Sequence, residues 1–122
     1  MKIRIKGNSV RLRLTKTDVR SLGTAGVVSD KTSFGTAVFT YQLQLSSNQN
    51  DMNASFENGT VTVFIPESMV NTLVHTERIG FDTRQDIGHG ETLFILVEKD
   101  FQCLDHTIED QSDMYINPNK TC

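Results

Sequence analysis

This sequence has no long apolar run, no export signal and little cysteine. The longest apolar run, residues 93–97, stops at Glu98, far short of the roughly 18 to 20 residues that a membrane-spanning helix needs. The chain opens with alternating charged and apolar residues, where a signal peptide would carry an unbroken apolar stretch. Two cysteines among 122 residues do not indicate a disulfide framework. We therefore expect a cytoplasmic protein without membrane segments, with Cys103 and Cys122 reduced.

Catalytic motifs are also missing. The sequence has no nucleophile elbow, no glycine-rich phosphate loop and no dinucleotide-binding fingerprint. Structural zinc sites usually show two tight pairs of ligands, whereas this chain offers one such pair, Cys103 and His106, followed by a lone Cys122. We therefore favour no metal site and predict no cofactor. We expect that the protein is not an enzyme. Cys103, His106 and Cys122 are weak candidates for metal ligands.

The composition predicts one globular domain built mainly from strands. A chain of 122 residues that is 37% hydrophobic and 22% charged has the size and balance of a single folded domain. Alternating apolar residues and turn signals such as Asn58-Gly59 predict strands near residues 2–6, 10–14, 27–34, 37–45, 52–57, 60–65, 78–83 and 91–98. Short helices are predicted after Thr15 and from Pro66.

These elements predict a mainly β (α+β) fold. Neither a βαβ rhythm nor an internal repeat is apparent, so we expect an antiparallel β-barrel or sandwich of 7–8 short strands with two short helices. Residues 1–122 form a single domain in this interpretation, and its acidic, polar C-terminal tail begins at about residue 101.

Charge is distributed very unevenly along the chain. The net charge is −3, yet residues 1–20 hold seven of the twelve Lys and Arg residues and a single acid, Asp18. Five of these basic residues alternate with apolar ones on the first two predicted strands, so they should share one face: Lys2, Arg4, Lys6, Arg11 and Arg13. Side chains on neighbouring strands stand roughly 5 Å apart, and like charges there repel. Something negative should therefore lie over this hairpin.

Two sources could supply the negative charge. In the first reading the protein supplies the negative charge itself, from Glu98 and Asp100 or from the tail acids Asp105, Glu109, Asp110 and Asp113. Alternatively, the hairpin binds a ligand, because guanidinium groups on rigid strands suit bidentate contact with phosphate or carboxylate. Nucleic acid is disfavoured, since the net charge is negative and no aromatic residue is interleaved among the basic ones to stack a base.

Four segments resemble a known family over nearly the whole chain. They are MKIRIKGNSVRLRL at the start, TSFG at residues 32–35, LVEKDFQCL at residues 96–104 and EDQSDMYINPN at residues 109–119. Together they resemble a family of small bacterial proteins of unknown function. The resemblance implies a single cytoplasmic domain. It adds no catalytic residue, because the family has no established activity.

Our first hypothesis is a binding or interaction domain whose basic hairpin receives an acidic partner or an anion. The simplest acidic partner is the chain's own C-terminal tail, or the tail of a second copy in a homodimer. The alternative is a phosphate-ester or polyphosphate hydrolase, or a barrel that binds a phosphate-bearing small molecule, with Glu98, Asp82 or the tail acids bringing in a divalent metal. The first strand, which offers Lys2, Arg4 and Lys6 but no carboxylate for Mg²⁺, counts against the enzyme.

Overall fold

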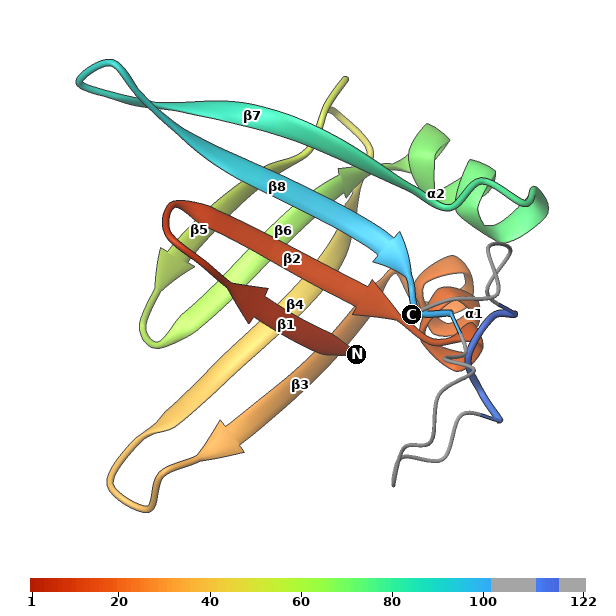
Figure 1. Ribbon diagram of the computed structural model, residues 1–122, viewed down its shortest axis with the longest axis horizontal. Coiled ribbons are helices and arrows are strands. Elements are labelled where there is room, and N and C mark those ends of the chain that lie inside the picture. The colour runs from red at the N-terminus through yellow and green to blue at the C-terminus, as the bar shows by residue number, and fades with distance from the viewer. Residues whose placement is uncertain (102–111, 117–122) are drawn as a thin grey trace.

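The computed structural model describes residues 1–101 and 112–116, and over these residues the chain forms two four-stranded sheets and two helices (Figure 1). The elements in chain order are β1 (Lys2–Ile5), β2 (Ser9–Leu14), α1 (Lys16–Ala25), β3 (Val27–Ser33), β4 (Val38–Ser46), β5 (Asn53–Glu57), β6 (Thr60–Pro66), α2 (Glu67–His75), β7 (Gly80–Gly88) and β8 (Glu91–Lys99). The mainly β prediction is confirmed. The arrangement is sandwich-like, without a closed barrel in the described part of the chain.

Each sheet contains two hairpins joined through a parallel pair of strands. Sheet A has the order β1-β2-β8-β7 and sheet B the order β3-β4-β6-β5. The hairpin pairings are antiparallel, but β2 pairs with β8, and β4 with β6, in parallel. The expectation of antiparallel pairing is wrong at these two central ladders. The period-2 pattern that predicts a strand is the same for both kinds of ladder, so it does not identify the neighbouring strand or its direction.

Turn and cap residues explain where the elements begin and end. Asn58 and Gly59, both with positive φ (52° and 74°), form the tight turn between β5 and β6 as predicted. The predicted capping box is also present: Thr15 Oγ1 accepts from the Asp18 backbone N–H, and Asp18 Oδ2 accepts from the Thr15 N–H. Helix α1 ends at Gly26, whose φ of 78° is the left-handed conformation that favours glycine.

The two halves of the chain repeat the same topology, contrary to the expectation of no internal repeat. Each half is a hairpin, a helix and a second hairpin. Adding 51 to the residue numbers of the first half turns the pair Lys2↔Arg13 into Asn53↔Phe64, which is the register observed between β5 and β6. The same step takes the N-cap of α1, Thr15, to Pro66, the N-cap of α2. The repeat therefore extends to strand register and helix capping.

The two hairpins of each half go to different sheets. Hairpin β1–β2 lies in sheet A beside β8, and hairpin β5–β6 lies in sheet B beside β4. The parallel pair Ser9↔Phe94 corresponds to Thr60↔Thr40, so Phe94 of β8 and Thr40 of β4 occupy equivalent positions, 54 apart. Each paired position of sheet A, except the pair Gly88↔Glu91 beyond the bulge, thus has a paired counterpart in sheet B that can serve as an internal reference.

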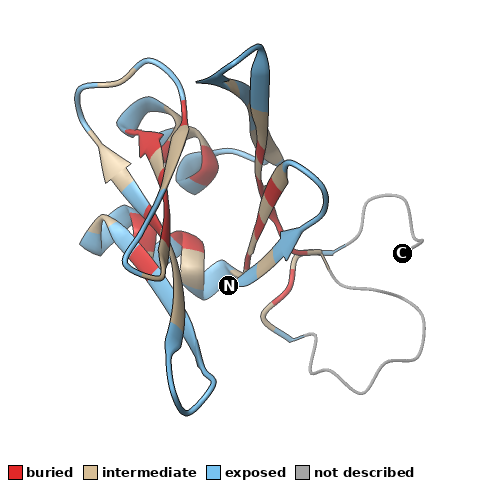
Figure 2. Cartoon of the chain, turned by 90° about the vertical axis from the view of Figure 1, so that its left-hand side faces the viewer, coloured by how far each residue is buried: buried red, intermediate tan, exposed pale blue. Residues whose placement is uncertain are grey.

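The hydrophobic core follows the same repeat. Leu12, Leu14, Val19 and Leu22 correspond to Val63, Ile65, Val70 and Leu73, and all eight are buried members of one core cluster. Figure 2 shows the buried residues gathered where the two sheets face each other and along the inner sides of the helices. Because β2 buries its even-numbered residues, its odd-numbered residues, including Arg11 and Arg13, project from the outer face of sheet A.

The helices lie together at one end of the sandwich, and the hairpin turns lie toward the other end (Figure 1). The helices approach closely at Gly23 and Val74, which are equivalent positions in the repeat. A Cβ atom on Gly23 would lie 3.0 Å from Val74 Cγ2. None of the helices in the described part of the chain is long and apolar enough to cross a membrane.

Candidate anion site on the outer face of sheet A

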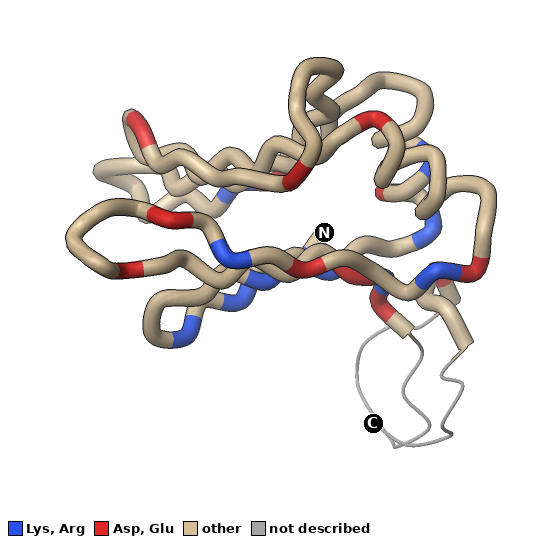
Figure 3. The backbone as a smooth tube through the Cα atoms, turned by 90° about the horizontal axis from the view of Figure 1, so that it is seen from above, with Lys and Arg blue, Asp and Glu red and all other residues tan. Residues whose placement is uncertain are grey.

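The register of β1 and β2 brings the predicted basic residues together on one face. Lys2 stands opposite Arg13, and Arg4 stands opposite Arg11. Lys6 follows in the turn, where its backbone N–H donates to the Ser9 carbonyl at 3.3 Å. Figure 3 shows Lys and Arg positions following one another along this hairpin. The register therefore places Lys2, Arg4, Arg11 and Arg13 on one face of the hairpin, and Lys6 lines the same hollow as Arg4 and Arg11 from the turn.

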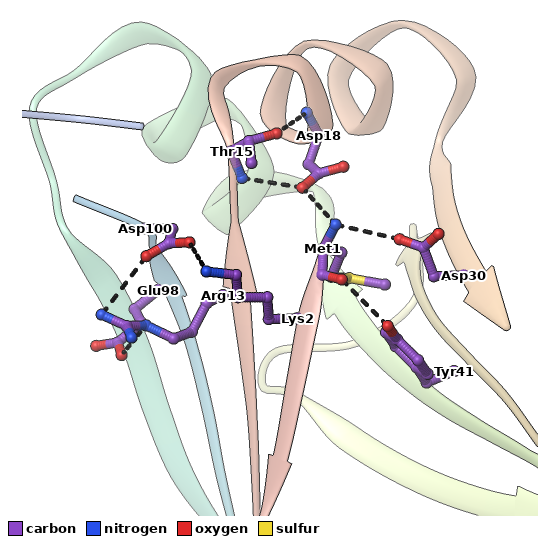
Figure 4. Close-up of polar contacts among 9 residues, drawn as sticks. All are labelled: Met1, Lys2, Arg13, Thr15, Asp18, Asp30, Tyr41, Glu98 and Asp100. Carbon is purple, nitrogen blue, oxygen red and sulfur yellow. Dashed lines mark hydrogen bonds and ion pairs between the residues drawn. The ribbon is translucent and has the colours of Figure 1, made fainter. Parts of the chain in front are cut away.

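The chain's amino group fixes β1 at the edge of sheet A. The Met1 ammonium lies 3.0 Å from Asp18 Oδ2 and 3.1 Å from Asp30 Oδ2, and Tyr41 Oη donates to the Met1 carbonyl (Figure 4). Burial alone would lower the pKa of this ammonium, but its hydrogen bonds to Asp18 and Asp30 outweigh burial and raise the pKa above its ordinary value. These contacts tie β1 to α1 and β3.

Two acids neutralise the end of the basic face that is nearer the helices. Glu98 Oε1 lies 3.4 Å from Arg13 Nε and 3.5 Å from Arg11 Nε. Asp100 lies 3.6 Å from an Arg13 terminal nitrogen and 3.4 Å from Lys2 Nζ (Figure 4). The prediction that Glu98 and Asp100 supply counter-charge is confirmed for these three basic residues. Because the Asp100 side chain is only 4% exposed, its charge requires such partners.

At the opposite end of the basic face, the described residues provide no such counter-charge. Arg4 and Lys6 make no ion pair with any residue among those described, and Arg11 meets Glu98 only through Nε. A hollow of about 180 Å³ lies here, lined by Arg4, Lys6, Ser9, Val10, Arg11 and Phe94. The Ser9 hydroxyl donates to the Lys6 carbonyl at 2.6 Å and so holds the turn that carries Lys6.

An aromatic side chain stands among the basic residues, which the sequence analysis missed. The parallel pairing of β2 with β8 places Phe94 beside Ser9, and Arg84 on β7 is the next residue across the sheet. The Arg84 guanidinium carbon lies 5.2 Å from the Phe94 ring centroid, which is a cation–π contact. No aromatic residue alternates with the basic ones along the hairpin sequence, but the pairing of β2 with β8 brings one next to them, so the expectation is wrong for the folded sheet. The alternation along β8 places Phe94, Leu96 and Glu98 on one face. It could have indicated that Phe94 lies on the same face as Glu98, the predicted partner of the basic residues.

Sheet B shows that the hairpin does not need these cations. The positions equivalent to Arg4, Lys6, Arg11 and Phe94 hold Ser55, Glu57, Thr62 and Thr40. Thr62 is nearly buried, and its hydroxyl accepts a hydrogen bond from Gln42 Nε2 at 2.9 Å. A surface of hydroxyl groups and one acid, without positive charge, thus occupies the same place in the fold. The positive charge of the hollow in sheet A is a property of that site and not of the architecture.

The described tail acid, Asp113, lies at the start of α1 and makes no ion pair with the five basic residues of the hairpin in the described part of the chain. Its carbonyl accepts from the Lys16 N–H at 3.1 Å, at the start of α1. Hydrogen bonds from Thr17 and Thr15, opposed by burial and helped by the charge of Arg20, hold the pKa of the Asp113 carboxyl below its ordinary value. Asp113 therefore stabilises the N-terminus of a helix.

The other tail residues named from the sequence lie outside the described residues. These are the acids Asp105, Glu109 and Asp110 and the weak metal candidates Cys103, His106 and Cys122. Within residues 1–101 and 112–116, no group of three or more His, Cys, Asp or Glu could hold a metal ion. Asp82 is exposed on β7, opposite Leu96, two strands away from Arg11.

Residues 1–119 match the model of a family described as Family of unknown function (DUF7009). The chain belongs to this family. The expected full-length resemblance to an uncharacterised family is confirmed. No curated protein and no solved structure matches the chain. Membership in DUF7009 assigns no activity, so the function must be argued from the site itself.

Proposed function

We propose that this protein is a binding domain that holds a phosphate-bearing small molecule in the hollow between Arg4, Lys6 and Arg11. One observation carries the proposal. Arg4 and Lys6, which make no ion pair in the described structure, line a hollow together with Arg11. The equivalent residues of sheet B are two hydroxyl residues and an acid, Ser55, Thr62 and Glu57. Like charges placed directly opposite each other on a sheet cost stability. A bound anion would offset that cost.

The arrangement of charge favours an oxyanion at the turn end of the face. Glu98 and Asp100 pair with basic residues at the helix end, so the cations without an ion pair among the described residues lie toward the turn. The contact from Glu98 orients Arg11 through Nε and leaves the terminal nitrogens of Arg11 without an ion pair in the described structure. Terminal guanidinium nitrogens are the donors that contact phosphate in pairs, and an oriented guanidinium loses less entropy on binding.

The size of the hollow indicates the size of the anionic group. Its volume of about 180 Å³ falls below the roughly 300 to 1,000 Å³ of a pocket for a drug-sized ligand. A single phosphate or a short phosphate chain suits this volume, with any organic part of the ligand extending over Phe94 or into solvent. Since Glu98 and Asp100 are held by basic residues, the proposal assigns them no metal and no catalysis. We place the activity in the cytoplasm on the sequence argument alone.

Isothermal titration calorimetry with tripolyphosphate, pyrophosphate and inorganic phosphate tests the proposal. The variants are Arg4→Ala and Arg11→Ala, and the control is Lys31→Ala. Lys31 is an exposed basic residue in sheet B, at the position equivalent to Arg84. A hydrogen bond to a charged group contributes about 1.5–3 kcal/mol, so each arginine variant should bind at least about tenfold more weakly. The control should bind like the wild type.

Three results would overturn the proposal. The wild-type protein could give no heat with any of the three phosphates. Lys31→Ala could lose as much affinity as Arg4→Ala, which would indicate unspecific attraction to positive charge. A polyglutamate peptide could bind while the phosphates do not, which would identify an acidic protein partner as the ligand.

A further inference from the structure

A second cavity lies at the helix end of the molecule, away from the basic hollow. Its volume is about 530 Å³, and it is lined by Thr76, Glu77, Ile79, Lys99, Phe101, Tyr115 and Ile116. Its aromatic wall is fixed by main-chain contacts: Phe101 forms a β-bridge with Tyr115, and the Tyr115 N–H donates to the Asp100 carbonyl at 2.8 Å. The two rings pack edge to face with centroids 5.5 Å apart. This volume is typical of small-molecule pockets.

Lys99 brings a buried amine to this largely apolar cavity. The residue is 4% exposed, and its Nζ donates to the Thr76 carbonyl at 3.0 Å and lies 4.9 Å from the Tyr115 ring centroid. No carboxylate among the described residues is within ion-pair distance of Lys99. An ammonium has three N–H donors, and one is directed to Thr76. Burial lowers the pKa of Lys99, and the charge of Glu77 partly opposes this effect.

The internal repeat shows that the fold does not require a lysine here. The pairs Leu14↔Lys99 and Ile65↔Leu45 are equivalent, so Leu45 is the counterpart of Lys99. Their backbones make matching hydrogen bonds, from Lys99 N–H to Ile79 O and from Leu45 N–H to Gly26 O. Leu45 packs against the hydrophobic core. An amine without a carboxylate partner among the described residues thus occupies a position that the other half fills with an aliphatic side chain. Burying such an amine costs stability.

We propose that this cavity binds a monocarboxylic acid with an apolar body, whose carboxylate pairs with the Lys99 ammonium. The apolar part of the ligand contacts Ile79, Phe101 and Tyr115. The ligand carboxylate supplies the counter-charge that no described residue gives Lys99, and it accepts from the ammonium N–H groups that are not directed to Thr76. Lys99 is buried, and a charge-assisted hydrogen bond to a buried group is stronger than the same bond at the surface. The ligand is thus selected by one charge at one end and by apolar contact elsewhere.

NMR titrations with octanoate and with 3-phenylpropionate, each compared with its neutral amide, test this assignment. Wild-type protein should bind each acid at least about tenfold more tightly than the amide, with saturable shifts of the Ile79 and Ile116 methyl groups. Lys99→Met keeps an unbranched side chain and resembles the Leu45 counterpart, so it should fold, bind acid and amide alike, and lose the preference. Glu77→Gln removes a rim charge that repels carboxylate and should strengthen binding of the acids only.

Several results would overturn the assignment. Neither acid could shift the cavity resonances of the wild-type protein. Lys99→Met could bind the acids as tightly as the wild type, or the wild type could bind acid and amide equally. Weaker binding of the acids by Glu77→Gln would also contradict a carboxylate ligand. Because Arg4→Ala leaves this cavity intact, it should bind octanoate like the wild type, which separates this proposal from the phosphate site.

Discussion

Replacing Arg4 with serine should show whether this arginine contributes to the stability of the fold or to ligand binding. Arg4 stands directly opposite Arg11, and the equivalent residue of sheet B, Ser55, is already a serine. A like-charge pair directly opposed across strands destabilises a sheet, and cross-strand pairs are worth roughly 0.2–1 kcal/mol. Removing one member should therefore leave the free energy of unfolding unchanged or raise it by about 0.5 kcal/mol. The gain should shrink at high salt, which screens exposed charges.

The same variant should lose its response to phosphate ligands. A ligand that binds only the folded state stabilises it by about 2.7 kcal/mol at a concentration 100 times Kd. Urea denaturation of wild type, Arg4→Ser and Lys31→Ser, at low and high salt and with or without tripolyphosphate, measures both effects. The wild type and Lys31→Ser should gain stability from the ligand, and Arg4→Ser should gain clearly less.

A large loss of stability in Arg4→Ser without ligand would refute this reasoning. If the variant unfolds more easily than the wild type by more than about 1 kcal/mol at both salt concentrations, Arg4 makes a contact that the fold needs. The comparison with sheet B would then fail as evidence for a site.

Three further predictions concern packing, capping and pH. Gly80→Ala should destabilise the protein by about 1–3 kcal/mol or more, measured by thermal denaturation, because its Cβ would clash with the Val97 carbonyl oxygen. Thr15→Ala removes the acceptor for the Asp18 N–H and should cost about 1 kcal/mol in urea denaturation. Burial lowers the pKa of Lys99 in the folded state, so between that lowered pKa and 10.5 the unfolded chain binds more protons than the folded one. The free energy of unfolding of the wild type should therefore rise with pH over this range, relative to that of Lys99→Met. Urea denaturation at increasing pH measures this difference.

Each of these predictions has a clear contrary result. A Gly80→Ala protein with unchanged melting would mean that β7 and β8 separate easily at this point. An unchanged Thr15→Ala protein would mean that the start of α1 does not depend on its cap. A stability difference between wild type and Lys99→Met that stays constant up to pH 10.5 would mean that the Lys99 pKa is not lowered.

Local chemistry explains which parts of the fold could be predicted from the sequence. Asn58-Gly59 and the capping box at Thr15 define their elements with a few neighbouring residues, and both were predicted. Strand pairing between distant segments depends on the whole core, so the contact of Ser9 with Phe94 could not be read from alternation. The repeat was missed because its equivalent residues share burial and register but seldom identity, as with Leu14 and Ile65.

The candidate site could be predicted only in part, because local alternation can be read from the sequence but the pairing of distant strands cannot. Alternation placed the five basic residues on one face, and the acids near the end of β8 were named as partners. The sequence did not indicate which cations stay uncompensated, because this depends on the register of β2 with β8, which sets Arg13 beside Glu98 and Ser9 beside Phe94. The buried amine of Lys99 was not singled out, since nothing nearby in the chain marks it as different from a surface lysine.

The most direct test of the central claim is a ¹H–¹⁵N NMR titration of the wild-type protein with tripolyphosphate. The account predicts saturable shifts of the backbone amides of Lys6, Ser9, Arg11 and Phe94, while the equivalent amides of sheet B, those of Glu57, Thr60, Thr62 and Thr40, stay in place. Absence of shifts, or shifts of similar size in both sheets, would contradict a built anion site on sheet A.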